Sequence, residues 1–328
     1  MTARQILPVI LALFCSVFQS SVAQAGTTYI ALGDSISFGE TDLNYVPSNG
    51  DRGYVGLLAN ALASQNGGVR PNVINLAIDG ETTTSFSTGS GRVPPVNGRT
   101  DTILASENTN YNPNALVSQS ALFQATLATQ KNLGITISTV SISLGDNNLF
   151  TLANLPGFTP GSATDPLLAT TLAAYKTGYA GVLDEVRSLL PNAKILLIGS
   201  YNPFPAQPNN PFGPLAAVGG AQVNTIIQGL AAQFGAQYVD TFDPFVGHEA
   251  AYTYQAQLPS GSSVGGTYGG TLPLGDVHPN ALGYSVIADA AINAASVPEP
   301  SSLILMGLGL AATVGYAGSR SRFGGSAV

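Results

Sequence analysis

A serine and a histidine near opposite ends of the chain are the residues best suited to do chemistry together. Ser35 ends the segment Gly33-Asp34-Ser35 after an early apolar run, and His278 is one of only two histidines in 328 residues. A serine hydroxyl is too weakly acidic to attack an ester unaided at neutral pH, so it needs a neighbouring base that titrates near pH 7. Ser35 and His278 therefore predict nucleophilic catalysis. His248 is the competing histidine, and its long loop favours a surface or substrate-side role.

Two further segments bring polar groups that suit the same reaction. Gly80 lies in a turn after the second apolar run, where a residue without a side chain lets a backbone N–H approach a ligand. Asn147 follows the third run in Gly145-Asp146-Asn147-Asn148 and adds an amide side chain. Both segments are expected at the rim where Ser35 and His278 meet.

The spacing of apolar residues predicts the elements that position these groups. Three-four spacing predicts helices over residues 54–63, 165–190, 223–234 and 281–294. Alternation of strands and helices predicts a parallel sheet covered on both faces, which is a three-layer α/β/α domain. In such a sheet, reactive groups gather where strands end. The short runs rich in Val, Ile, Leu or Tyr that predict its five strands are residues 27–32, 72–77, 135–144, 194–199 and 237–242.

Three long segments interrupt this alternation, namely residues 83–114, 147–166 and 242–274. Each follows a predicted strand directly or nearly so, and loops at that edge usually build a substrate site. We therefore predict loops there that shape the site. Disordered surface insertion is an equal alternative for the Gly-rich part, residues 260–270.

The segments around Ser35, Gly80, Asn147 and His278, in this order, resemble the four blocks of the SGNH (GDSL-type) hydrolase family, over nearly all of residues 26–294. The resemblance implies a flavodoxin-like five-stranded sheet. It also implies that Ser35 is the nucleophile, that His278 is the base, and that the oxyanion hole consists of the backbone N–H groups of Ser35 and Gly80 with the side chain of Asn147. The lone Gly33-Asp34-Ser35 turn lacks the second glycine of an α/β-hydrolase nucleophile elbow, which disfavours that fold.

The third block departs from the family pattern. Asn148 stands where the family usually has an aspartate. Asparagine keeps an acceptor but loses the charge. We expect altered support of the loop rather than lost catalysis.

The block around the base also departs from the pattern. The family's aspartate usually lies three residues before the histidine, where this chain has Gly275, and Asp276 lies only two residues before it. In an extended segment, residues two apart point to one face, so Asp276 can still orient the imidazole as the third catalytic residue. The alternatives are that Asp276 caps the next helix, and that the Gly275 carbonyl or the more remote Asp243 orients the base.

The N-terminus predicts export. Residues 1–25 have a basic start, an apolar stretch and Ala23-Gln24-Ala25, the small-x-small pattern that signal peptidase cleaves. A buried N-terminal helix is the alternative. Cys15 is the only cysteine, so its removal with the signal peptide excludes disulfides, a thiol nucleophile and thiolate metal ligands.

The C-terminus carries a different sorting pattern. Pro298-Glu299-Pro300, an uncharged stretch over residues 301–319 and the basic residues Arg320 and Arg322 resemble the PEP-CTERM tail of exported proteins in Gram-negative bacteria. The resemblance implies transient membrane association, cleavage by a sorting protease, and a destination at the cell envelope, cell surface or extracellular matrix. A plain transmembrane anchor is the alternative. The expected organisation is a signal peptide (residues 1–25), a hydrolase domain (26–296) and a sorting tail (297–328).

The charge and composition of the chain limit the partners and cofactors that it is expected to bind. Without the two terminal segments, 8 basic and 17 acidic residues remain, so nucleic acid is a poor partner. Two histidines cannot form a His-rich metal site, the carboxylates lack calcium-loop spacing, and no phosphate-binding glycine motif follows the first strand. We therefore expect no metal and no cofactor.

Together these features predict an exported serine ester hydrolase that works through an acyl-serine intermediate. Short acyl esters, lipids and acetylated polysaccharide all suit the chemistry as substrates. Two alternatives stay open. One is a non-catalytic surface or biofilm-matrix protein on the same fold, and the other is a serine acyltransferase that passes the same acyl group to an alcohol.

Overall fold

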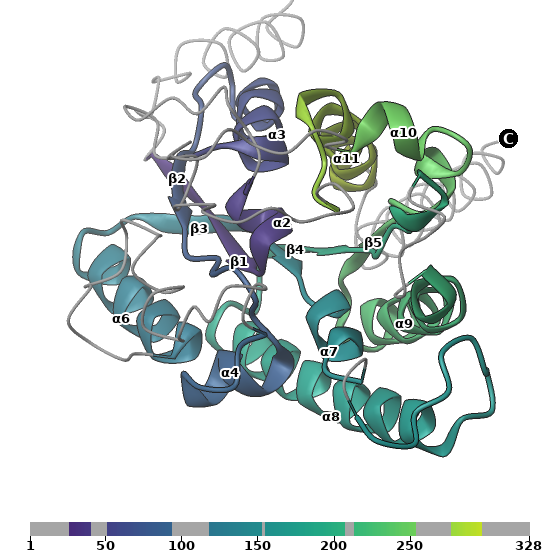
Figure 1. Cartoon of the computed structure of the whole chain (residues 1–328). Coiled ribbons are helices and arrows are strands. Elements are labelled where there is room, and N and C mark those ends of the chain that lie inside the picture. The colour runs from purple at the N-terminus through teal and green to yellow at the C-terminus, as the bar shows by residue number, and fades with distance from the viewer. Residues whose placement is uncertain are drawn as a thin grey trace, which may run out of the picture.

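A five-stranded parallel sheet in the order β2-β1-β3-β4-β5 forms the centre of the molecule (Figure 1). The computed structural model describes residues 26–40, 51–93, 118–152, 155–206, 213–253 and 277–296. The predicted signal peptide, the sorting tail, Gly275 and Asp276 lie outside these residues. The predicted sheet is confirmed, and its strands are β1 (Thr27–Gly33), β2 (Asn72–Asn75), β3 (Thr136–Ser143), β4 (Lys194–Ile198) and β5 (Gln237–Val239).

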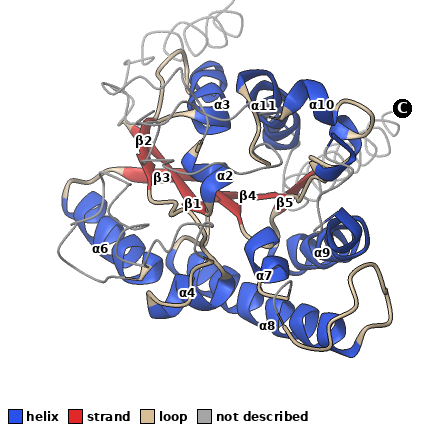
Figure 2. Cartoon of the chain, viewed as in Figure 1, coloured by secondary structure: helices blue, strands red, loops and turns tan. Residues whose placement is uncertain are grey.

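Helices cover both faces of the sheet, which confirms the three-layer architecture (Figure 2). Alternate residues of β1 show why: Tyr29 and Ala31 join the hydrophobic cluster on one face, and Ile30 and Leu32 join the cluster on the other. A strand buried on both faces is predominantly apolar, as β1 is from Tyr29 to Leu32. One face is covered by α3 (Gly53–Gln65) and α11 (Ala281–Ser296), and the other by α6 (Gln119–Asn132), α8 (Pro166–Leu189) and α9 (Gly213–Phe234).

The start of α8 follows from its sequence. Asp165 accepts hydrogen bonds from the backbone N–H groups of Leu167 and Leu168 at 2.8 and 3.3 Å. Pro166 takes the first helical position, where its missing N–H costs nothing. The predicted helix over residues 165–190 is therefore confirmed to within one residue at each end.

Helix α9 begins ten residues before the predicted start at Val223. Its first half contains Gly219 and Gly220, which weaken helix propensity. Tertiary packing outweighs that preference, because a Cβ on Gly219 would come within 3.0 Å of the Leu149 side chain. Within the described residues, α9 is the one helix long and apolar enough to cross a membrane, and Leu215, Val223, Ile227 and Leu230 bury it in the core.

The sequence did not predict α6, because the buried side of this helix is mostly polar. Gln119, Ser120 and Gln130 are buried beside Phe123. A helix that hides polar groups leaves no apolar period to detect. Helix α6 packs against β3, and its first residue, Gln119, accepts a hydrogen bond from Gly33 at the end of β1.

The three segments predicted to be loops are partly helical, so that prediction is wrong in detail. The described parts contain α4 (Thr83–Thr88), most of α7 (Asp146–Phe150) and α10 (Glu249–Tyr252). Each helix is too short to show a period in the sequence. The Gly-rich stretch at residues 260–270 lies outside the described residues.

Candidate active site

Ser35 and His278 are in direct contact although 243 positions separate them. The Oγ atom of Ser35 lies 2.8 Å from Nε2 of His278. Ser35 is the first residue of α2 (Ser35–Phe38), which starts as soon as β1 ends, and His278 lies just before α11. The carboxyl edge of a parallel sheet thus brings together the two residues that sequence reasoning paired.

Gly33 and Asp34 shape the turn that carries Ser35. Gly33 has a φ of +119°, and a Cβ there would overlap the carbonyl oxygen of Ser143 on β3. Asp34 donates its N–H to that same oxygen at 3.0 Å, and its carboxylate accepts the N–H of Ile36 at 3.1 Å. The turn is therefore tied to both its own helix and the next strand. N–H groups in a first helical turn have no partner within the helix, so the Ser35 N–H can serve a ligand.

Two acids, the buried Asp34 and the partly buried Asp146, lie near the Ser–His pair. Burial, followed by the charge of Asp146, raises the pKa of Asp34 to about 8. Burial likewise raises the pKa of Asp146 to about 6, against the lowering effect of its hydrogen bond from Ser200 and of the charge on His278. Asp34 is therefore mostly protonated at neutral pH. A neutral Asp34 places no full negative charge beside a negatively charged reaction intermediate.

Gly80 and Asn147 lie next to each other at the same edge. Gly80 has a φ of +73°, which only glycine adopts easily, and its carbonyl accepts the N–H of Val93 at 2.9 Å. The side chain of Asn147 donates through Nδ2 to the carbonyl of Glu81 at 3.2 Å. An amide nitrogen has two protons, so this bond orients the amide and uses one of its two N–H groups. The Asn147 amide is thus held by the residue that directly follows Gly80, which keeps the two candidate oxyanion donors close together.

Asn148 makes a reciprocal pair with Thr83. Its Oδ1 accepts the Thr83 N–H at 3.2 Å, and its Nδ2 donates to the Thr83 hydroxyl at 3.1 Å. An ionised aspartate cannot donate, so it would make only part of this pair. The substitution relative to the family pattern therefore ties the third block to the start of α4.

The segment that carries His278 is held from two sides. The hydroxyl of Tyr201 donates to the carbonyl of Val277 at 2.9 Å. Asn280 donates its side-chain amide to the carbonyl of Ala251, the third residue of α10, at 2.7 Å. The short segment that carries the imidazole is thus bonded to Tyr201, in the loop after β4, and to α10.

Asn280 also performs the capping role considered for Asp276. Its Oδ1 accepts the N–H groups of Leu282 and Gly283, both at 3.0 Å, at the start of α11. Asp276 and Gly275 lie outside the described residues, so their part in orienting His278 stays a prediction.

The two residues that were alternatives to His278 and Asp276 in the site, His248 and Asp243, are both exposed. His248 is exposed just before α10, and its ring stacks on Tyr252 with a centroid distance of 5.3 Å. Asp243, the remoter candidate acid, is also exposed. Among the described residues, no group of three or more His, Cys, Asp or Glu side chains is placed to hold a metal ion.

Three polar residues that sequence reasoning did not select lie behind the Gly80 turn, namely Glu81, Arg92 and Gln119. Glu81 offered a signal, because only 9% of the residues are charged and this one directly follows a candidate oxyanion glycine. The other two lie 11 and 38 positions further along the chain, and their partnership with Glu81 appears only in three dimensions.

The strand order and the contact between Ser35 and His278 are those of an SGNH-type hydrolase fold. The family model of the GDSL-like Lipase/Acylhydrolase family matches residues 31–286, so the chain belongs to this family and is a hydrolase that acts on ester bonds. The PEP-CTERM protein-sorting motif matches residues 296–321. This motif points to export and to a cell-envelope sorting tail of Gram-negative bacteria.

Solved structures share the fold at low sequence identity. A GDSL-like protein from Parabacteroides merdae ATCC 43184 aligns with a TM-score of 0.51 and 14% identity, over 83% of this chain and 96% of its own. The lipase Lip_vut3 from a goat rumen metagenome aligns with a TM-score of 0.51 and 17% identity, over 82% of this chain and 97% of its own. No curated protein matches the sequence.

Proposed function

We propose that the protein cleaves acyl esters through an acyl-serine intermediate, with Ser35 as nucleophile and His278 as general base. The single observation that carries this proposal is the 2.8 Å contact between Ser35 Oγ and His278 Nε2. That distance is within hydrogen-bond reach, which proton transfer from the hydroxyl requires.

The reaction runs in two halves. Nε2 of His278 takes the proton of Ser35 as Oγ adds to the ester carbonyl, and the same proton then passes to the departing alcohol. Water repeats the attack on the acyl-serine, its proton going to His278 and then to Ser35, and the carboxylic acid leaves. In both tetrahedral intermediates the negative oxygen is stabilised by the N–H groups of Ser35 and Gly80 and by the Asn147 side chain. Asp276 or the Gly275 carbonyl orients the imidazole.

The substrate is an acyl ester that the protein meets outside the inner membrane. Short acyl esters, lipids and acetylated polysaccharide share the carbonyl that this site attacks. The PEP-CTERM motif supports an envelope, surface or matrix location, where acetylated polysaccharide is accessible. In the proposed organisation, signal peptidase removes residues 1–25, residues 26–296 form the hydrolase domain, and a sorting protease cleaves within 297–328 after transient membrane association. Mass spectrometry of the exported protein tests this, because an intact Val328 would contradict cleavage.

Turnover of a p-nitrophenyl acyl series, together with fluorophosphonate labelling, tests the catalytic proposal. We expect the wild type to hydrolyse short esters and to take one label, and Ser35→Ala to lose both. An unlabelled, inactive wild type would favour the non-catalytic surface protein. Acyl transfer to an added alcohol in preference to water would identify an acyltransferase with the same intermediate.

A further inference from the structure

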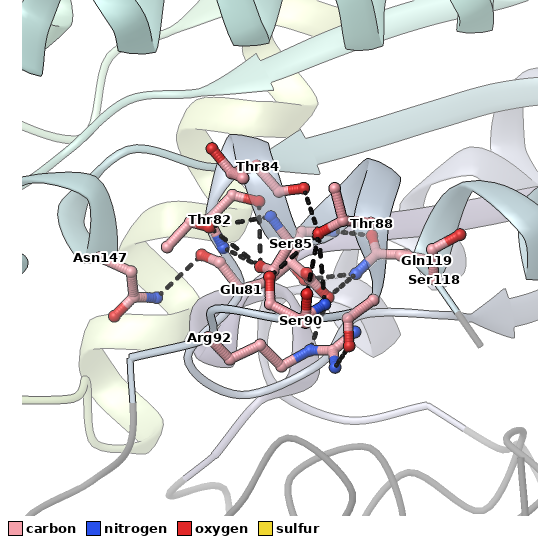
Figure 3. Close-up of polar contacts among 12 residues, drawn as sticks. Glu81, Thr82, Thr84, Ser85, Thr88, Ser90, Arg92, Ser118, Gln119 and Asn147 are labelled. Carbon is pink, nitrogen blue, oxygen red and sulfur yellow. Dashed lines mark hydrogen bonds and ion pairs between the residues drawn. The ribbon is translucent and has the colours of Figure 1, made fainter. Parts of the chain in front are cut away.

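Glu81, Arg92 and Gln119 form a buried polar cluster, and the side chain of Asn147, one of the candidate oxyanion donors, bonds to the main chain of Glu81 beside it (Figure 3). Oε2 of Glu81 accepts hydrogen bonds from Nε of Arg92 at 3.2 Å and from Nε2 of Gln119 at 3.1 Å. The exposed fractions of these three residues are 0%, 5% and 0%. The charged groups of Glu81 and Arg92 and the amide of Gln119 are thus shielded from water and bond mainly to one another.

Gln119 extends the cluster to the nucleophile turn. Its Oε1 accepts the N–H of Gly33 at 2.6 Å, and its Nε2 donates to the carbonyl of the same residue at 2.9 Å. A single side chain therefore holds both peptide groups of a residue that lies two positions before Ser35.

The main chain of Glu81 connects to the other two donors. Gly80 is its neighbour in sequence, and the carbonyl of Glu81 accepts the amide of Asn147 at 3.2 Å. On the far side, Arg92 is followed by Val93, whose N–H donates to the Gly80 carbonyl at 2.9 Å. The segment after α4 thus returns to the Gly80 turn and holds it by a backbone bond and an ion pair.

We propose that Glu81 is a positioning residue that aligns the three oxyanion donors through its bonds with Gln119, Arg92 and Asn147. The inference rests on the proposed function, because the donors must act on an oxyanion for their alignment to matter. Glu81 touches neither the substrate nor the reacting atoms in this scheme.

The chemistry of the cluster favours a positioning role over a simple packing role. Apolar residues of similar volume usually replace a buried ion pair with no loss of stability, so packing alone does not call for charges here. Burial raises the pKa of Glu81 to about 7, although the charge of Arg92 and the hydrogen bonds from Ser85, Arg92 and Gln119 act to lower it. What the cluster does supply is two directional hydrogen bonds to Oε2 of Glu81, from Arg92 and from Gln119, and displacing either donor leaves a buried polar group without its partner.

The decisive experiment compares Glu81→Met with Glu81→Gln in ester hydrolysis. Methionine has a similar length but accepts no comparable hydrogen bond, whereas glutamine keeps one carbonyl oxygen that can accept from Arg92 and Gln119. We expect Glu81→Met to lower kcat about 10- to 100-fold while KM stays within about twofold, and Glu81→Gln to keep at least about a third of the wild-type kcat. Glu185→Gln is the matched control, because this carboxylate also anchors α6, through Ser120 and Gln124, and should leave kcat unchanged.

A boronic acid inhibitor supplies a readout that a merely structural role would not move. The Ser35 oxygen adds to boron as its proton passes to His278, which gives a negative tetrahedral adduct that resembles the reaction intermediate. In Glu81→Met, we expect Ki for the boronic acid to rise by the same factor as kcat falls, with an unchanged near-ultraviolet circular dichroism spectrum.

The proposal is overturned if Glu81→Met keeps kcat within about twofold of the wild type. It is also overturned if the loss of activity equals the loss of folded protein measured by circular dichroism. An inactive wild type would instead contradict the proposed function, so the two failures are distinguishable.

Discussion

The two sides of Ser35 are built differently. On the oxyanion side, formed by Ser35, Gly80, Glu81 and Asn147, the supporting groups are fully buried and include an ion pair between residues with 1% and 0% exposed side chains. On the base side, formed by residues 277–280 with α10, the supporting bonds that involve the described residues are neutral and partly exposed. Among the described residues, the supports of the oxyanion side are therefore the more deeply buried, and we expect that side to be the more rigid of the two.

This difference matches the work proposed for each side. Oxyanion donors stabilise charge only when they are fixed before the charge develops, because reorganisation during the reaction costs part of the benefit. A base must instead serve two acceptors in turn, the serine and then water or the leaving group, and a segment held by neutral bonds permits small adjustments. The predictions below test this contrast.

The largest effect is expected on the oxyanion side. Asn147→Ala removes a donor that is held by the Glu81 carbonyl, and loss of one such donor typically lowers kcat about 10²- to 10³-fold. Steady-state kinetics on a p-nitrophenyl ester should show this loss with little change in KM. Asn148→Ala is the control, because it breaks only the pair with Thr83. Equal losses in the two variants would contradict the assigned roles.

A smaller effect is expected where the base segment meets α10. Asn280→Ala removes the amide bond to Ala251 and the cap of α11, so we expect kcat to fall about tenfold and stability to fall by about 1 kcal/mol. Asn280→Asp separates the two roles, since a carboxylate still caps the helix but cannot donate to Ala251. Thermal melting and kinetics of both variants provide the measurement. Full activity in Asn280→Ala would show that the base does not depend on this anchor.

The mildest kinetic effect is expected from the other anchor of the base. Tyr201→Phe removes the hydroxyl that donates to Val277 but keeps the ring. A neutral hydrogen bond is worth about 1 kcal/mol, which corresponds to about fivefold in kcat at most. A loss beyond about 50-fold would mean that the base side is as tightly constrained as the oxyanion side, and the contrast would fail.

The last prediction concerns Asp34, which lies between the two sides. Its pKa is raised to about 8 in the folded state, mainly by burial, so the folded protein binds this proton more tightly than the unfolded chain does. The resulting stability is present below the unfolded pKa and is lost as the pH rises through the folded pKa.

We therefore expect Tm to fall between about pH 4 and about pH 8, and Asp34→Asn to flatten that fall. Asparagine keeps an acceptor for the Ile36 N–H, and Asp184→Asn, at an exposed position on α8, is the control. Differential scanning calorimetry across this range gives the answer. A Tm that rises with pH in the wild type would contradict the direction.

The predictability of each element depended on how much of its stabilisation is local. The strands and α8 were predictable because their signals lie within short stretches of consecutive residues. These signals are the apolar runs, the three-four spacing and the helix start at Asp165-Pro166. Helix α6 was not, since its buried face is polar and its partners lie on β1 and α8. The early start of α9 was hidden for a related reason, because the advantage of Gly219 is its close packing against Leu149, which is distant in sequence.

The sequence by itself was enough to predict the pair proposed to react. Only two histidines exist, only His278 precedes a predicted helix at the sheet edge, and Ser35 follows the first strand, so residue chemistry and chain order were sufficient. The tertiary structure alone decided what holds the donors in place. Glu81, Arg92 and Gln119 come from three separate segments, and no local rule links them. A buried polar bond depends on which groups the folded chain leaves without water, and that is settled only when the core has closed around them.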